Sequence, residues 1–266
     1  MSVKAANMNN TPNVVIFGEE GVGKSSVVNM IAGHDIASTS GEASACTFES
    51  KSFLVNLDDR PVTLWDTVGL HEGGVNTEAK DAIVNLYKLL KSLENGISLL
   101  VYCVRGPKPN ISRTARNYKI FYDGLCQRRV PIVLVVTGLE GEEPMGEWWT
   151  RNKDSFGMQK MSFSGQACVT ATKGKLKKGT HMFQQEYEES VGEVRKLVYG
   201  YCHHRPWQLK ASKSNQTMLF VKIVVNIGIG VFNLPPLVLC HMLYEVLKEH
   251  GGFEDIDARK IANAAV

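Results

Sequence analysis

Hydrophobic residues along this chain gather in short continuous runs that alternate with segments of helical period. The runs at 14–17, 97–104 and 131–137 are apolar almost throughout, which is typical of parallel strands buried on both faces. Residues 77–93 carry apolar side chains at helical spacing, and residues 181–202 form a second long predicted helix. Strands that alternate with helices predict an α/β fold of three layers, with helices on both faces of a mainly parallel central sheet.

The region between the first strand and the 77–93 helix has a different pattern. Two short predicted strands at 51–57 and 61–65 are separated by Asp58-Asp59-Arg60, which predicts a hairpin. Residues 34–50 show no sustained periodicity and are predicted to form a long loop, a kind of segment that is often functional. Shorter helices are predicted at 25–31, 112–126 and 147–156, and a further strand at 165–172.

Composition narrows the function classes. The chain has 266 residues, of which 44% are hydrophobic, and this is enough for one large domain or for one domain with an extension. The net charge of +3 is small for this length and argues against a dedicated nucleic-acid-binding protein, so no nucleic-acid partner is expected. Six cysteines without a C-x-x-C pair indicate reduced thiols and a cytoplasmic protein.

A glycine-rich stretch follows the first predicted strand and opens the first predicted helix. Residues 16–26 read I-F-G-E-E-G-V-G-K-S-S, which contains the spacing G-x-x-x-x-G-K-S. Glycines allow the backbone N–H groups to curl around a phosphate at a helix N-terminus, Lys24 reaches the β- and γ-phosphates, and the Ser25 hydroxyl binds Mg²⁺. The predicted phosphate-side residues are Gly18, Glu19, Glu20, Gly21, Val22, Gly23, Lys24, Ser25 and Ser26.

A second motif, D-x-x-G, begins at Asp66, where the second hairpin strand ends. A carboxylate there holds Mg²⁺, usually through water, and the Gly69 N–H can approach a γ-phosphate because glycine has no side chain to block it. Thr47 is the favoured threonine for closing on Mg²⁺ and the γ-phosphate because it lies just before the 51–57 strand, and Thr39 is the alternative. The predicted catalytic residues are Lys24, Thr47 and Gly69, and the predicted metal-binding residues are Ser25, Thr47 and Asp66.

The motif order G-E-E-G-V-G-K-S, then C-T-F-E, then W-D-T-V-G-L resembles the P-loop GTPases of the translation-factor class. Within that class the chain resembles the septin-like and immunity-associated GTPases (GIMAP or AIG-type), including uncharacterised fungal G-domain proteins. The resemblance covers residues 12–202. It implies a P-loop NTPase G domain that binds GTP or GDP with Mg²⁺, hydrolyses GTP slowly and uses loops 34–50 and 66–76 as switches. It also implies a homodimer through the G domains.

The resemblance further implies a base motif of the form N-K-x-D or T-K-x-D after the fifth strand. This chain has Thr137-Gly138-Leu139-Glu140, so Glu140 keeps a carboxylate for guanine while Gly138 removes the lysine. Thr170-Ala171-Thr172 is similar to the later segment in which an N–H group meets the guanine carbonyl. The residues assigned to the base side are Thr137, Gly138, Glu140, Thr170 and Ala171.

The sequence departs from Ras-like proteins at Leu70, because leucine cannot orient an attacking water as glutamine does. Another residue or a partner is then expected to assist hydrolysis. His71 is one candidate, although the favoured interpretation of His71 is a solvent-facing residue of the switch loop. Two other functions stay open. A nucleotide-held scaffold without appreciable turnover is favoured by Leu70, and a P-loop ATPase is favoured by the altered base motif.

The amino-acid composition of the chain changes after the predicted G domain. We divide the sequence into a flexible leader at 1–11, the G domain at 12–205 and an apolar, helical extension at 206–266. The segment 219–240 is apolar enough to suggest a bilayer contact, although Asn226 is costly in a membrane helix. Three interpretations stay open: packing on the G domain, contact with the cytosolic face of a membrane, and a dimer or partner surface.

Overall fold

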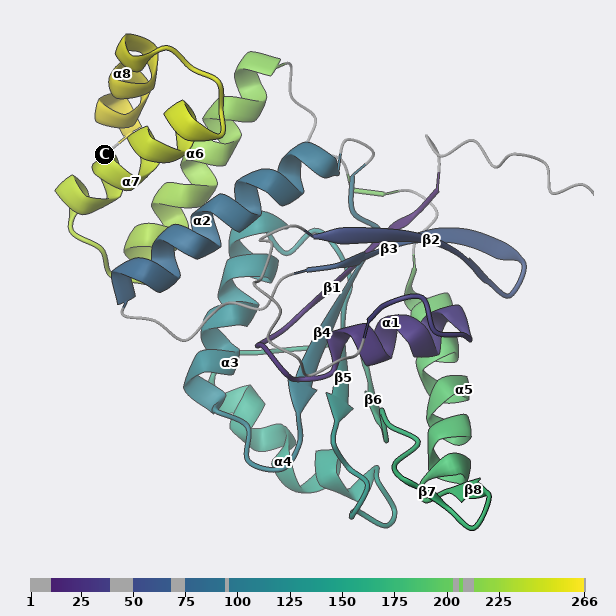
Figure 1. Ribbon diagram of the computed structural model, residues 1–266. Coiled ribbons are helices and arrows are strands. Elements are labelled where there is room, and N and C mark those ends of the chain that lie inside the picture. Colours follow the sequence, from purple (N-terminus) through teal and green to yellow (C-terminus); the bar gives the residue numbers. More distant parts are fainter. Residues whose placement is uncertain are drawn as a thin grey trace, which may run out of the picture.

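The central sheet positions the predicted site residues that lie in the described part of the chain. The computed structural model describes residues 11–38, 50–67, 75–93, 96–202, 206–207 and 213–265 (Figure 1). Within these ranges, six strands pair in the order β2-β3-β1-β4-β5-β6, and only β2 runs antiparallel to its neighbour. The strands are β1 (Asn13–Phe17), β2 (Lys51–Leu57), β3 (Arg60–Asp66), β4 (Leu99–Arg105), β5 (Ile132–Thr137) and β6 (Gly165–Cys168).

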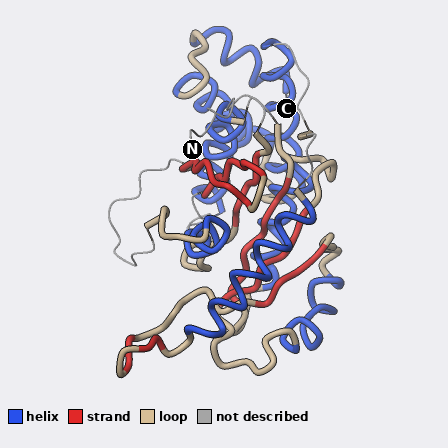
Figure 2. Tube along the Cα trace, turned by 90° about the vertical axis from the view of Figure 1, so that its right-hand side faces the viewer, coloured by secondary structure: helices blue, strands red, loops and turns tan. Residues whose placement is uncertain are grey.

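Helices cover both faces of this sheet, which confirms the predicted three-layer α/β fold (Figures 1 and 2). Side chains of α1 (Lys24–Ala32) and α5 (Gln184–Tyr201) share one core with the sheet residues Ile16 and Val101. The opposite core gathers residues of β1 and β4 with those of the remaining helices. These helices are α2 (Val75–Ser92), α3 (Ile111–Tyr118), the π-helix η2 (Lys119–Leu125), α4 (Glu147–Met158), α6 (Lys213–Gly230), α7 (Pro236–Glu249) and α8 (Asp255–Ala265).

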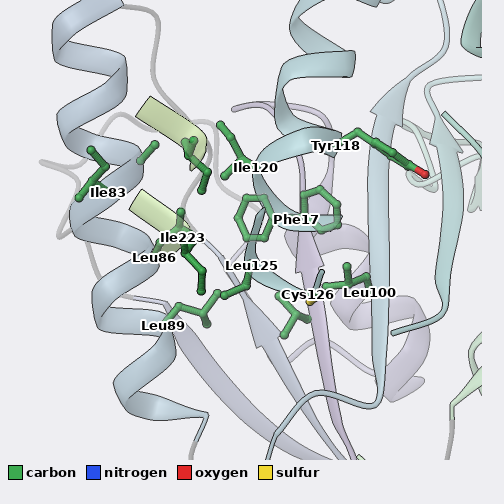
Figure 3. Packing of buried hydrophobic residues seen from close by; sticks show 14 of the residues in the cluster. Phe17, Ile83, Leu86, Leu89, Leu100, Tyr118, Ile120, Leu125, Cys126 and Ile223 are labelled. Carbon is green, nitrogen blue, oxygen red and sulfur yellow. The ribbon is translucent and has the colours of Figure 1, made fainter. Parts of the chain in front are cut away.

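The last three helices complete the second core. The ring of Phe220 on α6 meets Tyr87 of α2 edge-on, with 4.8 Å between ring centroids, and Ile227 lies against Gly124 of η2. Figure 3 shows Ile223 of α6 in the same cluster as Leu86 of α2. The buried apolar side chains of α6 therefore pack on the rest of the domain, whereas Met218 and Ile229 are exposed. The packing of the buried side chains agrees with the first of the three interpretations of segment 219–240.

Contacts at the surface reinforce this packing. The ammonium of Lys80 on α2 lies 2.9 Å from the carboxylate of Glu245 on α7, and Lys91 donates a hydrogen bond to the carbonyl of His250. No helix in the described ranges is long and apolar enough to cross a bilayer. Of the predicted leader at 1–11, residues 1–10 lie outside the described residues, and the boundary at 205/206 stays a prediction.

Several predicted boundaries were wrong for identifiable reasons. Helix α5 begins at Gln184 rather than at 181, because the preceding residues form the small hairpin β7 (Leu176–Lys177) and β8 (Thr180–His181). Its turn places Lys178 and Gly179 at positive φ, 51° and 85°, as a two-residue hairpin turn requires. The predicted helix at 112–126 is divided between α3 and η2, and α8 was not predicted.

Candidate functional site

The glycine loop that joins β1 to α1 has a backbone path that only glycine permits at two points. A Cβ atom at Gly18 would lie 2.3 Å from the carbonyl oxygen of Cys103 on the neighbouring strand β4. Gly23 adopts φ 92° and ψ 25° and forms the N-cap of α1 without a side-chain hydrogen bond to the helix. The loop therefore passes close to the sheet and presents the α1 N-terminus without a side-chain cap, a geometry suited to an anion.

The side chain of Lys24 is enclosed by this loop. It is 9% exposed, and its ammonium donates a hydrogen bond to the carbonyl oxygen of Glu19 at 2.8 Å. Burial lowers the pKa of Lys24, and the negative charge of Asp66 acts in the opposite direction. A buried cation at a helix N-terminus attracts an anion from two sides, because both the ammonium and the helix dipole favour negative charge.

The two predicted metal-binding side chains in the described residues lie together. The Ser25 hydroxyl, in the first turn of α1, donates a hydrogen bond to Oδ2 of Asp66 at the end of β3, at 2.8 Å. Burial raises the pKa of Asp66, while the Ser25 hydrogen bond and Lys24 lower it. Hydroxyl and carboxylate oxygens are hard ligands, so this pair fits Mg²⁺.

The base-side segment is fastened to the phosphate loop by Thr137 at the end of β5. Its hydroxyl donates a 2.6 Å hydrogen bond to the carbonyl oxygen of Val22, and its side chain is buried. Gly138 follows with φ 74°, and Glu140 is half-buried two residues later. These contacts bring the two predicted halves of the site together at the carboxyl edge of the sheet, where phosphate sites of such folds occur.

The second base-side segment follows β6. The backbone N–H of Thr170 donates to the Ser190 hydroxyl of α5 at 3.0 Å, and its own hydroxyl contacts the sulfur of Met145 at 3.2 Å. Thr170 is completely buried, and Ala171 beside it is half-buried. Thr170 thus fixes this loop to α5 and to the segment that precedes α4, and Ala171 is the more accessible of the two.

Comparison with known proteins identifies the fold. Residues 13–137 match the family described as 50S ribosome-binding GTPase. The chain is 27% identical over 137 residues to GTPase Der of Campylobacter curvus, which is 51% of this chain and 27% of Der. It is 41% identical over 66 residues to the uncharacterized protein YkfA of Escherichia coli, which is 25% of this chain and 23% of YkfA. The chain thus matches about a quarter of the length of each of these curated relatives.

Two solved structures share the arrangement of the sheet and helices. A dimerization-deficient mutant of Toc33 from Arabidopsis thaliana superposes with a TM-score of 0.51 at 18% identity, over 72% of this chain and 85% of Toc33. A mutant of Era from Aquifex aeolicus bound to GDP·AlF4⁻ gives 0.51 at 15% identity, over 76% of this chain and 60% of Era. The chain has the fold of a P-loop GTPase G domain. The narrower resemblance to septin-like, immunity-associated and fungal GTPases stays a prediction.

The predicted site residues divide into those that the structure describes and those that it does not. Hydrogen bonds connect the glycine loop to Asp66 through Ser25 and to the base side through Thr137. The remaining predicted residues, Thr47 and Gly69 with the alternatives Thr39, Leu70 and His71, lie outside the described residues.

Two residues that support the phosphate loop, Arg113 and Thr67, were not predicted from the sequence. Arg113 at the start of α3 pairs with the carboxylate of Glu19 at 3.7 Å, and Thr67 donates its hydroxyl to the carbonyl of Ile16 at 2.9 Å. The start of α3 could have been predicted from Asn110, because asparagine is a favoured N-cap residue and its side chain accepts the N–H of Arg113 at 3.1 Å. The pairing of Arg113 with Glu19 had no such signal, since 94 positions separate the two residues along the chain.

Proposed function

We propose that this protein binds GTP and GDP with Mg²⁺, hydrolyses GTP slowly and uses nucleotide state as a switch. The observation that carries the proposal is the enclosed Lys24 ammonium, which lies beside an α1 N-terminus that no side chain caps. The match of residues 13–137 to a GTPase family supports the assignment of the nucleotide. The test is to purify the protein and identify the nucleotide that it carries by chromatography; bound ATP or ADP would favour the ATPase alternative instead.

The phosphate chemistry follows from the positions of three side chains. Lys24 and the N-terminus of α1 bind the β- and γ-phosphates, and Ser25 with Asp66 would hold Mg²⁺. Bound Mg²⁺ would neutralise negative charge that develops between the β- and γ-phosphates. Burial raises the pKa of Asp66 because it disfavours the charged carboxylate, and a bound cation would stabilise that charged form.

Turnover is proposed to need a second molecule. The sequence places Leu70 where a water-orienting glutamine can stand, so we expect a dilute, isolated chain to hydrolyse GTP at about 10⁻³ s⁻¹ or slower. For the chloroplast translocon components atToc33 and psToc159, dimerization is important for GTPase activity. We therefore expect the single-turnover rate to rise with protein concentration. A fast rate that is independent of concentration and is abolished by His71→Ala would contradict this prediction.

Base selection is proposed to rest on Glu140. Its carboxylate can accept hydrogen bonds from guanine N1–H and N2–H₂, whereas adenine opposes it with an acceptor at N1. We expect GDP to bind more tightly than ADP by calorimetry, and Glu140→Ala to reduce the ratio of the two affinities about tenfold or more.

The matched control for Glu140 is Glu193→Ala, which removes an exposed carboxylate from α5. This variant should keep the wild-type ratio of GDP to ADP affinity. Equal binding of GDP and ADP by the wild type, or an unchanged ratio in Glu140→Ala, would refute the role of Glu140.

A further inference from the structure

Arg105 ends β4 and lies across a glycine in the base-side segment. A Cβ atom at Gly138 would lie 3.3 Å from Cγ and 3.5 Å from Cζ of Arg105. Both the aliphatic stem and the guanidinium group therefore cover this glycine. Pro107 closes the same space, with its Cδ 3.4 Å from that position.

This arrangement favours glycine at position 138. Its φ of 74° is a conformation that other residues seldom adopt, and the neighbouring atoms leave little room for a side chain. The cationic side chain at this point therefore comes from Arg105 of the adjacent strand rather than from position 138.

Arg105 lies next to the segment that joins the two halves of the site. It pairs in register with Thr137, whose carbonyl accepts the Gly106 N–H at 2.8 Å and whose hydroxyl holds Val22 of the phosphate loop. Glu140 follows two residues after Gly138. A planar cation and a carboxylate thus flank the same short loop.

The guanidinium group of Arg105 has no structural partner in the part of the chain that is described. It is exposed, and none of the carboxylates in those ranges forms an ion pair with it. Two other described arginines are paired, Arg128 with Asp123 at 2.8 Å and Arg195 with Asp58 at 2.8 Å. Arg105 is thus free to contact a ligand.

We infer that Arg105 binds the purine by laying its guanidinium plane against the face of the base, while Glu140 reads the edge. This inference rests on the proposed function. A guanidinium group is planar and weakly hydrated, so it stacks on aromatic rings, and lysine lacks this planar group. Arg105 therefore contributes affinity for the base, in addition to the phosphate contacts of Lys24.

The test compares a ligand that has a base with one that has none. GDP and inorganic pyrophosphate are titrated into wild type, Arg105→Ala and Arg105→Lys. We expect Arg105→Ala to weaken GDP binding about ten- to a hundredfold and to leave pyrophosphate binding within about twofold of wild type. Arg105→Lys restores little GDP affinity, because it restores the charge without the plane.

Arg129→Ala is the matched control, since Arg129 is exposed and precedes β5 at the opposite edge of the sheet. It should bind both ligands as wild type does. GDP affinity within twofold of wild type in Arg105→Ala, or equal losses for GDP and pyrophosphate, would overturn the stacking role. Wild type that binds pyrophosphate but neither GDP nor GTP would overturn the proposed function itself.

Discussion

Lys24→Met is expected to weaken GDP and GTP binding by about a hundredfold or more without destabilising the protein that lacks nucleotide. The ammonium is the enclosed cation of the phosphate loop, and hydrogen bonds to charged groups contribute about 1.5–3 kcal/mol each. Two such bonds to phosphate account for the hundredfold loss, because each 1.4 kcal/mol is a factor of ten. Calorimetry with GDP measures the loss.

The stability part of this prediction follows from the pKa of Lys24. Burial lowers that pKa, so the folded protein disfavours the ammonium more than the unfolded chain does. The burial of the charged ammonium therefore lowers the free energy of unfolding, and this loss is fully present at every pH below the pKa of Lys24 in the folded protein. The loss disappears as pH rises from that folded pKa to the ordinary pKa of lysine, because the ammonium is then deprotonated in the folded protein first. Methionine carries no charge, so urea unfolding of Lys24→Met without nucleotide should give a free energy equal to or above that of wild type.

Lys153→Met provides the control, because Lys153 is exposed on α4. It should change neither nucleotide affinity nor unfolding free energy by more than about 0.5 kcal/mol. Retention of GDP affinity within tenfold in Lys24→Met would show that this lysine does not bind phosphate. A marked loss of stability would show instead that its contact with Glu19 supports the fold.

The second large effect is expected in the C-terminal helices. Leu243→Ala should lower the free energy of unfolding by about 2–5 kcal/mol, because Leu243 is completely buried in the core shared with the sheet. Leu237→Ala lies on the same helix, α7, but its side chain is 82% exposed, and its effect should stay within about 0.5 kcal/mol. Urea unfolding monitored by circular dichroism measures both.

The comparison of these two leucines separates the interpretations of the chain end. If α6–α8 form part of the G-domain core, Leu243→Ala lowers the stability of the whole transition, including the sheet. Equal, small effects of the two substitutions would show that this region contributes little to the domain. Independent unfolding of the C-terminal helices, seen as a separate transition, would support the predicted division at 205/206.

Local sequence was sufficient for the phosphate side of the site. The phosphate-loop motif lies within about 20 consecutive positions: an apolar strand, six loop residues with glycine at both ends, and an amphipathic helix. Gly18, Gly23 and Lys24 could therefore be assigned without tertiary information. Asp66 was equally accessible, since a carboxylate at the end of a parallel strand must lie at the carboxyl edge of the sheet. In the structure its carboxylate accepts a hydrogen bond from the Ser25 hydroxyl, which agrees with a position at this edge.

The base side depended on pairing between distant segments. The Thr137 hydroxyl donates a hydrogen bond to the carbonyl of Val22, which lies 115 positions earlier in the chain. Arg105 covers Gly138 from the neighbouring strand β4. The hydrophobic pattern of these segments does not indicate which distant residue each one contacts. Thr170 shows the same limit, because its burial against Ser190 depends on where α5 returns to the sheet.

The sequence by itself determined the layered α/β architecture and the phosphate loop, because buried parallel strands and glycine conformations leave their signature in local pattern. Only the tertiary structure decided what the apolar end of the chain contacts. The apolar composition of 219–240 predicts that this segment is buried away from water. A lipid bilayer, a partner protein or the rest of its own domain could each bury it. The structure places Phe220 and Ile227 against α2 and η2, and sequence could not foresee this contact because packing depends on the shape of a surface that only the folded sheet and helices create.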